Sequence, residues 1–229
     1  MQAIDRGAAD SLIGWWLDAG VDGAVSETPR DWLGEQKPRR ETVPATTSPA
    51  EKPADLAAFQ AWLATAPGLP MDRPGAIRVS PHGPECAKIM LLPDLPARED
   101  AAQGKPIGGE AWALTCRMLA AIGLNADESY VASLSPFHAP GARFNGDLDS
   151  CATIARDHVR LARPERLILF GDASAKGLTG EPLARARGKV HRVEGVRTIA
   201  TFHPRWLLQR PSDKALAWRD LLLLMSEGD

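Results

Sequence analysis

A histidine followed by proline marks the C-terminal part of the sequence, in TFHPRWLLQRP at residues 201–211. Val196 and Ile199 precede it with the apolar character of a strand, so His203 is predicted to lie at the carboxyl end of a strand. An imidazole in that place can donate a hydrogen bond to negative charge that develops in a reaction. It could equally cap a turn, because Pro204 fixes the next backbone angle.

A carboxylate occupies a similar place upstream. Asp94 follows CAKIMLL, an apolar run at residues 86–92 that predicts a buried strand. Its side chain could stabilise a cation or hold a water molecule. The stretch Pro-Asp-Leu-Pro is also typical of a simple turn, and the sequence leaves both interpretations open.

Alternating strands and helices are expected to position these two groups. The predicted strands are 86–92, 129–135, 166–171 and the second arm of a hairpin at 189–203, and the predicted helices are 55–65, 110–124, 150–164, 173–180 and 213–225. This order predicts an α/β fold, a three-layer α/β/α sandwich with a central four-stranded parallel sheet. Ligands of such sheets bind outside the carboxyl ends of the strands, where Asp94 and His203 should meet.

The sequence divides into three predicted parts. Residues 1–27 hold a short amphipathic helix at 8–19, residues 28–54 form a proline-rich disordered linker, and residues 55–229 form the α/β domain. What the helix does, docking on the domain or recruiting a partner, stays open.

Composition excludes several classes of protein. No apolar run of about 20 residues predicts a membrane span, and the first residues lack the pattern of a secretory signal. The three cysteines form no CxxC pair, which favours a reducing, cytoplasmic location over a disulfide framework. His82 and Cys86 are four residues apart but lack further ligands nearby, so no metal site is predicted. The chain is expected to be a monomer.

Four segments together resemble the uracil-DNA glycosylase superfamily, closest to its family four. They are IMLLPDLPAREDAAQGKPIGGEAW, YVASLSPFHAPGARF, LILFGDASAKGLTG and TFHPRWLLQRPSDKALAWRDLLLL. The spacing of Gln103-Gly104-Lys105-Pro106, of Met118–Leu124 and of the His-Pro segment makes the match specific, and it extends over about residues 85–229 or from as early as 55.

The resemblance implies a DNA repair enzyme that hydrolyses the N-glycosidic bond of a base flipped out of DNA, uracil or another deaminated base. By position, His203 would stabilise the departing base and Asp94 the sugar cation or a water molecule. Residues Pro93, Leu95, Ile107 and Ser133 would line the base pocket. DNA contacts would come from Arg143, Lys176, Arg205, Trp206, Leu207 and Arg210, with Arg205 and Arg210 facing outward and Lys176 at a helix start. Trp206 and Leu207 could instead pack under the terminal helix.

The sequence departs from the family pattern at several of these positions. Pro93 replaces a glycine, Ile107 replaces the stacking phenylalanine, and Ser133 replaces the asparagine that reads the base edge. Phe137 replaces an iron–sulfur cysteine, and only Cys151 matches a cluster ligand. We therefore expect no iron–sulfur cluster and no other cofactor.

One alternative to an active enzyme remains, and a second is disfavoured. A catalytically degenerate DNA- or protein-binding module on the same fold would explain the departures. A basic C-terminal part, with 15 Lys and Arg against 11 Asp and Glu over residues 138–229, suits a phosphate partner but also an ordinary solvated face. A phosphate-loop nucleotide-binding protein is disfavoured, because GxxxxGK[ST] and GxGxxG are both absent. The sequence does not specify the base, the strand preference or whether the protein is active.

Overall fold

The structure is a computed structural model that describes residues 53–138, 144 and 147–226. The predicted amino-terminal segment at 1–27, nearly all of the linker at 28–54 and the proposed DNA contact Arg143 lie outside the described residues. All the described residues belong to one compact unit, which begins at Pro49.

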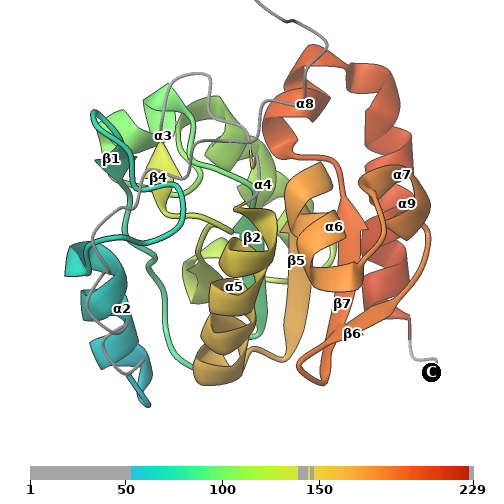
Figure 1. Cartoon of the computed structure of the whole chain (residues 1–229). Helices are drawn as coiled ribbons and strands as arrows, with labels where there is room; N and C mark the ends of the chain where they lie inside the picture. The colour runs from blue at the N-terminus through green and yellow to red at the C-terminus, as the bar shows by residue number, and fades with distance from the viewer. Residues whose placement is uncertain (1–52, 139–143, 145–146, 227–229) are drawn as a thin grey trace, which may run out of the picture. The chain divides into compact units, whose positions relative to one another are not determined.

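A five-stranded sheet forms the centre of this unit, with the strand order β3-β2-β5-β7-β6 (Figure 1). The strands are β2 (Ile89–Pro93), β3 (Ser129–Val131), β5 (Arg166–Phe170), β6 (His191–Val193) and β7 (Val196–Thr201). Strands β3, β2, β5 and β7 are parallel, as predicted, whereas β6 pairs antiparallel with β7. The four-stranded prediction therefore omitted an edge strand, the first arm of the hairpin. Glu194 and Gly195 turn this hairpin with φ of 49° and 81°, the left-handed pair that suits a tight turn.

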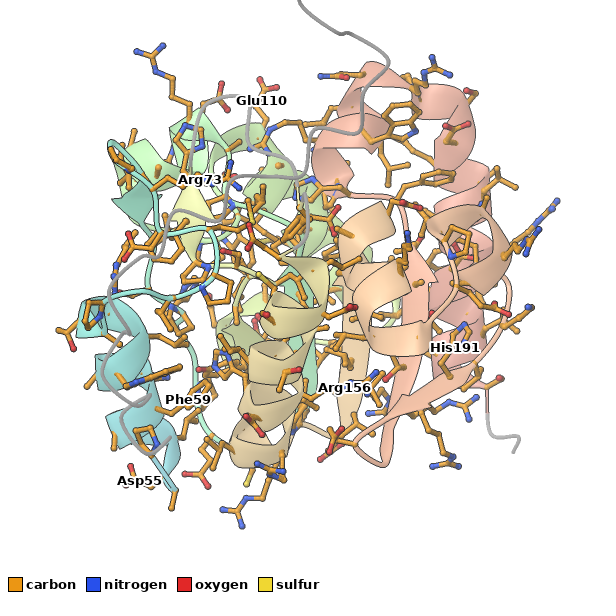
Figure 2. All side chains as sticks on the ribbon, in the orientation of Figure 1. Asp55, Phe59, Arg73, Glu110, Arg156 and His191 are labelled. Atoms are coloured by element: carbon orange, nitrogen blue, oxygen red, sulfur yellow. The ribbon has the colours of Figure 1, made fainter. Side chains whose placement is uncertain are left out.

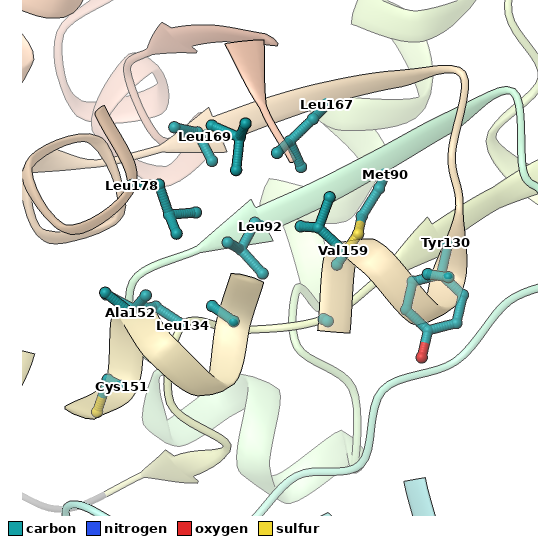
Figure 3. Close-up of a cluster of buried hydrophobic side chains, with 14 of the residues drawn as sticks. Met90, Leu92, Tyr130, Leu134, Cys151, Ala152, Val159, Leu167, Leu169 and Leu178 are labelled. Carbon is teal, nitrogen blue, oxygen red and sulfur yellow. The ribbon is translucent and has the colours of Figure 1, made fainter. Parts of the chain in front are cut away.

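Helices cover both faces of the sheet, which confirms the predicted α/β/α sandwich. Helices α5 (Leu148–Ala162) and α6 (Asp172–Thr179) lie on one face, and α4 (Gly109–Ala121) and α9 (Lys214–Met225) on the other (Figure 1). Side chains point alternately to the two faces along each strand, so a strand contributes to the hydrophobic core on each face of the sheet. Leu167 and Leu169 pack toward α5 and α6 (Figure 3), whereas Ile168 packs toward α4 and α9.

Several short elements were not predicted from the sequence, because they are too short to show a period. They are α3 (Arg98–Gln103), α7 (Leu183–Ala186), α8 (Pro204–Gln209), the 3₁₀ turns η1 (Ala126–Glu128) and η2 (Pro211–Asp213), and a two-stranded sheet of β1 (Ile77–Arg78) and β4 (Phe137–His138). Among them, α3 and α8 follow the carboxyl ends of β2 and β7. Pro204 opens α8 because a first-turn residue needs no backbone N–H.

Helix α2 (Leu56–Thr65) begins as predicted, with the Asp55 side chain accepting a bond from Ala58 N at 2.8 Å. Phe59 is fully buried, and its ring lies 5.1 Å from that of His158 on α5 (Figure 2). The hydroxyl of Tyr130 lies 2.6 Å from His158 Nε2 and accepts a bond from Gln60. This polar chain joins α2, β3 and α5 inside an otherwise apolar core.

The described helices include none with the length and hydropathy that a membrane span requires.

Burial lowers the pKa of His158 to about 3, so this side chain is neutral in the native state and charged in the unfolded state below pH 6.5. The unfolded state then binds the extra proton, and the free energy of unfolding should fall as pH decreases from 6.5 toward 3, by about 2 kcal/mol at pH 5 from this residue alone. Urea denaturation between pH 7.5 and 4.5 measures the slope. His158→Gln should flatten it, even if the variant is less stable at pH 7.5. An equally steep slope in the variant would contradict this assignment.

Candidate functional site

The imidazole of His203 is fixed through one nitrogen and free at the other. It caps helix α8, because Nδ1 accepts a hydrogen bond from the backbone N–H of Arg205 at 3.0 Å. Nε2 is buried and has no partner among the described residues. An accepting Nδ1 places the ring proton on Nε2. The two interpretations of the sequence, a cap and a site residue, are therefore compatible in one side chain.

The surroundings of His203 keep it neutral. Burial, and to a smaller extent the charge of Arg205, lower its pKa to about 4, against the opposing effect of Asp100. Its ring stands edge-on to Phe170 at 6.0 Å. At neutral pH the residue is an uncharged donor with an unused N–H.

Asp94 directly follows β2 and reaches across to the start of α6. One carboxylate oxygen accepts from Ser174 N at 2.7 Å and the other from Ala173 N at 3.2 Å. Burial raises the pKa of Asp94, whereas the bonds from Ser174 and Ala173 oppose the rise. The carboxylate therefore acts as an N-terminal cap of α6, and the bonds from Ser174 and Ala173 do not use all of its acceptor capacity.

Gly171 allows this approach and links Asp94 to the His203 strand. A Cβ at Gly171 would lie 2.3 Å from an Asp94 oxygen, and the residue has φ of +120°. The same residue donates its N–H to the carbonyl of Thr201 at 3.2 Å, two positions before His203. Both predicted catalytic residues thus lie at the carboxyl edge of the sheet, just after β2 and β7, with β5 between these two strands.

A buried ion pair ties the two loops that carry these residues. Asp100, on α3, is fully buried and accepts from Arg205 Nη2 at 2.9 and 3.1 Å. It also accepts from Gly108 N at 2.6 Å and Ala97 N at 2.7 Å. Asp100 therefore uses both oxygens to fix the loop after β2 to Arg205, whose backbone N–H in turn holds His203. The sequence shows an acidic pair here, Glu99 and Asp100, but nothing local to it indicates this role for Asp100.

This pair corrects the prediction that Arg205 faces outward to a DNA phosphate, because its guanidinium is engaged with Asp100. Leu207 is 1 % exposed and packs with Leu114 and Ala217, so it offers no surface to DNA in this conformation. Lys176 is exposed but lies in the last turn of α6 rather than at a helix start. It is therefore not placed where a helix N-terminus would assist it in binding a phosphate.

Trp206 and Arg210 do face solvent. Trp206 is 39 % exposed, and its indole N–H donates to Asp213 at 2.8 Å. The guanidinium of Arg210 lies 4.6 Å from the centre of its ring, and Phe202 stacks at 6.3 Å. Arg187 covers Phe202 at 4.2 Å. Two stacked aromatic rings thus lie between two cations beside His203, in the order Arg187, Phe202, Trp206 and Arg210.

The four residues predicted to line a base pocket are placed differently from one another. Ile107 is fully buried, in the core that includes Leu91 and Phe170. Pro93 is buried as the last residue of β2, and Leu95 is partly buried against the α5 core. The hydroxyl of Ser133 is buried with no partner among the described residues, so it is the one member of this set with a free polar group.

The model of the uracil DNA glycosylase superfamily matches residues 80–222, more than half of the chain. The chain belongs to the uracil DNA glycosylase superfamily. It is 28 % identical over 141 residues to a type-4 uracil-DNA glycosylase from Archaeoglobus fulgidus, covering 56 % of this chain and 71 % of that protein. It is also 25 % identical over 149 residues to a DNA polymerase of Bacillus phage SP01, covering 63 % of this chain but only 16 % of that polymerase.

The residues of this superfamily member do not fit the iron–sulfur cluster that resemblance to family four implies. Phe137 is fully buried in the core with Cys151. Burial, together with the charge of Asp147, raises the pKa of Cys151 to about 12, so its thiol does not readily form the thiolate a cluster needs. Within the described part of the chain, no group of three metal-ligating side chains converges.

In the region of Phe137, hydrogen bonds from Arg78 connect several segments of the chain. Its guanidinium donates to the carbonyls of Leu63 at 3.0 Å and Ala66 at 2.7 Å, which end helix α2, and to Asp72 at 2.8 Å. It also lies 4.8 Å from the ring centre of Phe137, its partner in the β1–β4 pair. One side chain thus connects α2, the loop that follows it, and both strands of the small sheet.

Arg78→Gln should lower the free energy of unfolding by about 1–3 kcal/mol, because helix carbonyls and Asp72 lose a charged donor. Arg73→Gln is the matched control, since Arg73 forms only an exposed pair with Asp147 and should change stability by less than about 1 kcal/mol. Chemical denaturation with and without a strong iron chelator measures both effects. Equal losses in the two variants, or unfolding promoted by the chelator, would contradict this role of Arg78.

Proposed function

We propose that this protein hydrolyses the N-glycosidic bond of uracil, or of another deaminated base, flipped out of DNA. The observation that carries the proposal is the neutral His203, whose buried Nε2–H is unused, at the carboxyl edge of the sheet. Membership of the superfamily supports it, as does the similarity to a type-4 uracil-DNA glycosylase.

The chemistry follows from charge. As the bond between C1′ and the base nitrogen breaks, its electron pair leaves with the base, and the sugar becomes cationic. Water then adds to C1′, and its proton is released. The Nε2–H of His203 donates to the oxygen on which the base gathers negative charge, and one such donor is worth about 2.7–4 kcal/mol. A neutral imidazole suits this role because it needs no proton transfer.

Asp94 faces the sugar cation in this mechanism. Its carboxylate keeps lone pairs beyond those used by Ser174 and Ala173, so it can hold the attacking water or stabilise positive charge while capping α6. Ser133 supplies a hydroxyl to the base, which can donate or accept. A hydroxyl is less selective than an amide, so this pocket is expected to discriminate weakly among deaminated bases.

The exposed surface beside His203 suits the DNA strand. Trp206 offers an aromatic ring to an unstacked base or the gap it leaves, and Arg210 offers a cation to a phosphate. Arg205 is assigned a different role, holding the His203 loop through Asp100.

One specific observation favours the alternative, a DNA-binding module without catalysis. Ile107, at the position of a stacking ring, is fully buried in the core, so no aromatic face from this position is available to a base. Proteins on one fold often differ in chemistry in this way. The two functions predict opposite results in a single assay.

The test uses single- and double-stranded oligonucleotides that carry uracil, hypoxanthine or xanthine. They are incubated with the protein, and alkali then cleaves them at any abasic sites formed. His203→Ala should lower the rate about 10²–10³-fold because the anion loses its donor. Asp94→Asn should also lower it, whereas His191→Gln, a histidine on β6 bonded to Ala186 O, should not. Product formation that is unaffected by His203→Ala would overturn the mechanism. Absence of product with salt-sensitive DNA binding would establish the module.

The salt dependence of DNA binding distinguishes the roles proposed for Arg205 and Arg210. Arg210→Gln should reduce the slope of log K for DNA against log salt by about 1, because one phosphate contact is lost. Arg205→Gln should leave the slope unchanged and lower stability, because Asp100 loses its buried partner. Fluorescence anisotropy at several salt concentrations measures the slopes. A smaller slope in the Arg205 variant alone would mean that Arg205 contacts phosphate.

A further inference from the structure

A groove lies on the face of the sandwich that α4 and α9 cover, and it reaches Leu207 of α8. It has a volume of about 400 Å³, within the range of binding pockets. Its apolar lining consists of Leu114, Met118, Ala121, Leu207, Ala217, Trp218 and Leu221. Two cations, Arg117 and Lys214, complete it. None of these residues takes part in the proposed reaction.

The groove is open, and its rim is apolar. Trp218 is 40 % exposed and Leu222, one turn further along α9, is 47 % exposed. Lys214, Trp218 and Leu222 are spaced by four and share one face of that helix. A tryptophan and a leucine side by side on a helix surface are typical of a binding surface rather than of a solvated one.

The charged residues of the groove indicate what kind of partner it would bind. Arg117 and Lys214 are exposed, and neither side chain has a hydrogen bond or ion pair with any described residue. No carboxylate lines the groove within the described part of the chain. A two-fold contact with a second copy of the chain would place these cations near themselves, which is unfavourable. A nucleic acid backbone would need a longer run of cations than two. A partner with both acidic and apolar side chains would match the two cations and the apolar lining of the groove.

The dimensions suit a helix. On α4 the lining runs from Leu114 to Ala121, and on α9 from Lys214 to Leu221, which is eight residues or about 10 Å in each case. Two turns of a third helix have the same length and present apolar side chains at i, i+4 and i+7.

We propose that this groove binds an acidic amphipathic helix of a partner protein, whose apolar residues pack on Trp218 and Met118 and whose carboxylates pair with Arg117 and Lys214. The site is independent of the glycosidic reaction and would recruit the protein to, or hold it in, an assembly.

The test begins with a phage-displayed library of random 16-residue peptides, selected on the full chain. Selected peptides are synthesised with a fluorescent label and titrated by anisotropy. Enriched sequences should carry apolar residues at i, i+4 and i+7 together with Asp and Glu, and salt should weaken their binding. Lys214→Glu and Trp218→Ala should each raise Kd at least about ten-fold. Arg185→Glu, an equivalent charge reversal on exposed α7, should not.

Several results would overturn the proposal. They are the absence of enriched peptides, enrichment without carboxylates, and binding that Lys214→Glu leaves intact. Lys214 is exposed and outside the core, so this variant tests the groove even if Trp218→Ala fails to fold. Concentration-dependent dimerisation that Lys214→Glu abolishes would assign the groove to a second copy. Weaker DNA binding in Lys214→Glu would assign it to nucleic acid. Neither result bears on glycosylase activity, which the oligonucleotide assay measures separately.

Discussion

The buried pair of Asp100 and Arg205 is the interaction on which the arrangement of the site depends. Asp100 has no exposed surface, and four donor contacts from three residues converge on its carboxylate. Removing one partner of such a pair leaves a buried charge, which typically costs about 3–5 kcal/mol. The pair joins α3, which follows β2, to α8, which follows β7. The positions of His203 and of the loop after β2 are therefore set together, although more than a hundred residues separate them in the chain.

The sequence predicted the parallel strands and the main helices well because each has a regular pattern of apolar residues. Four buried parallel strands read as short apolar runs, and the main helices were recognisable from their spacing and from breakers such as Pro164. The edge loops were harder to predict. Arg205 follows His-Pro and looks like a free cation, and nothing local shows that its partner is Asp100, because that contact exists only after β2 and β7 are brought together. For Leu207 the sequence left two interpretations open, a DNA contact or packing under the terminal helix, and the structure has it in a small core with Leu114 and Ala217.

Both candidate catalytic side chains also stabilise the fold. His203 accepts a backbone bond at the start of α8 through one nitrogen, and Asp94 caps α6 through both oxygens. Such bonds fix rotamers, which is what a preorganised site requires. They also explain why an imidazole and a carboxylate could persist here without catalysis: each has a structural use. Retention of the two residues therefore says little about activity, and the decisive feature is the unused proton on His203 Nε2.

The departures from the family pattern lie in two places with different consequences. Around Phe137 and Cys151, a hydrophobic core and the Arg78 hydrogen bonds form the contacts between helix α2 and the small sheet, so the fold has a physical basis without thiolate ligands there. At the position of the stacking ring, Ile107 is fully buried in a core that also holds Phe170 and Trp112, so this position itself presents no aromatic ring to a base. The first change affects only how the scaffold is held together. The second removes the aromatic ring that the family pattern places against the base, so the proposed function assigns more of the base binding to His203 and Ser133.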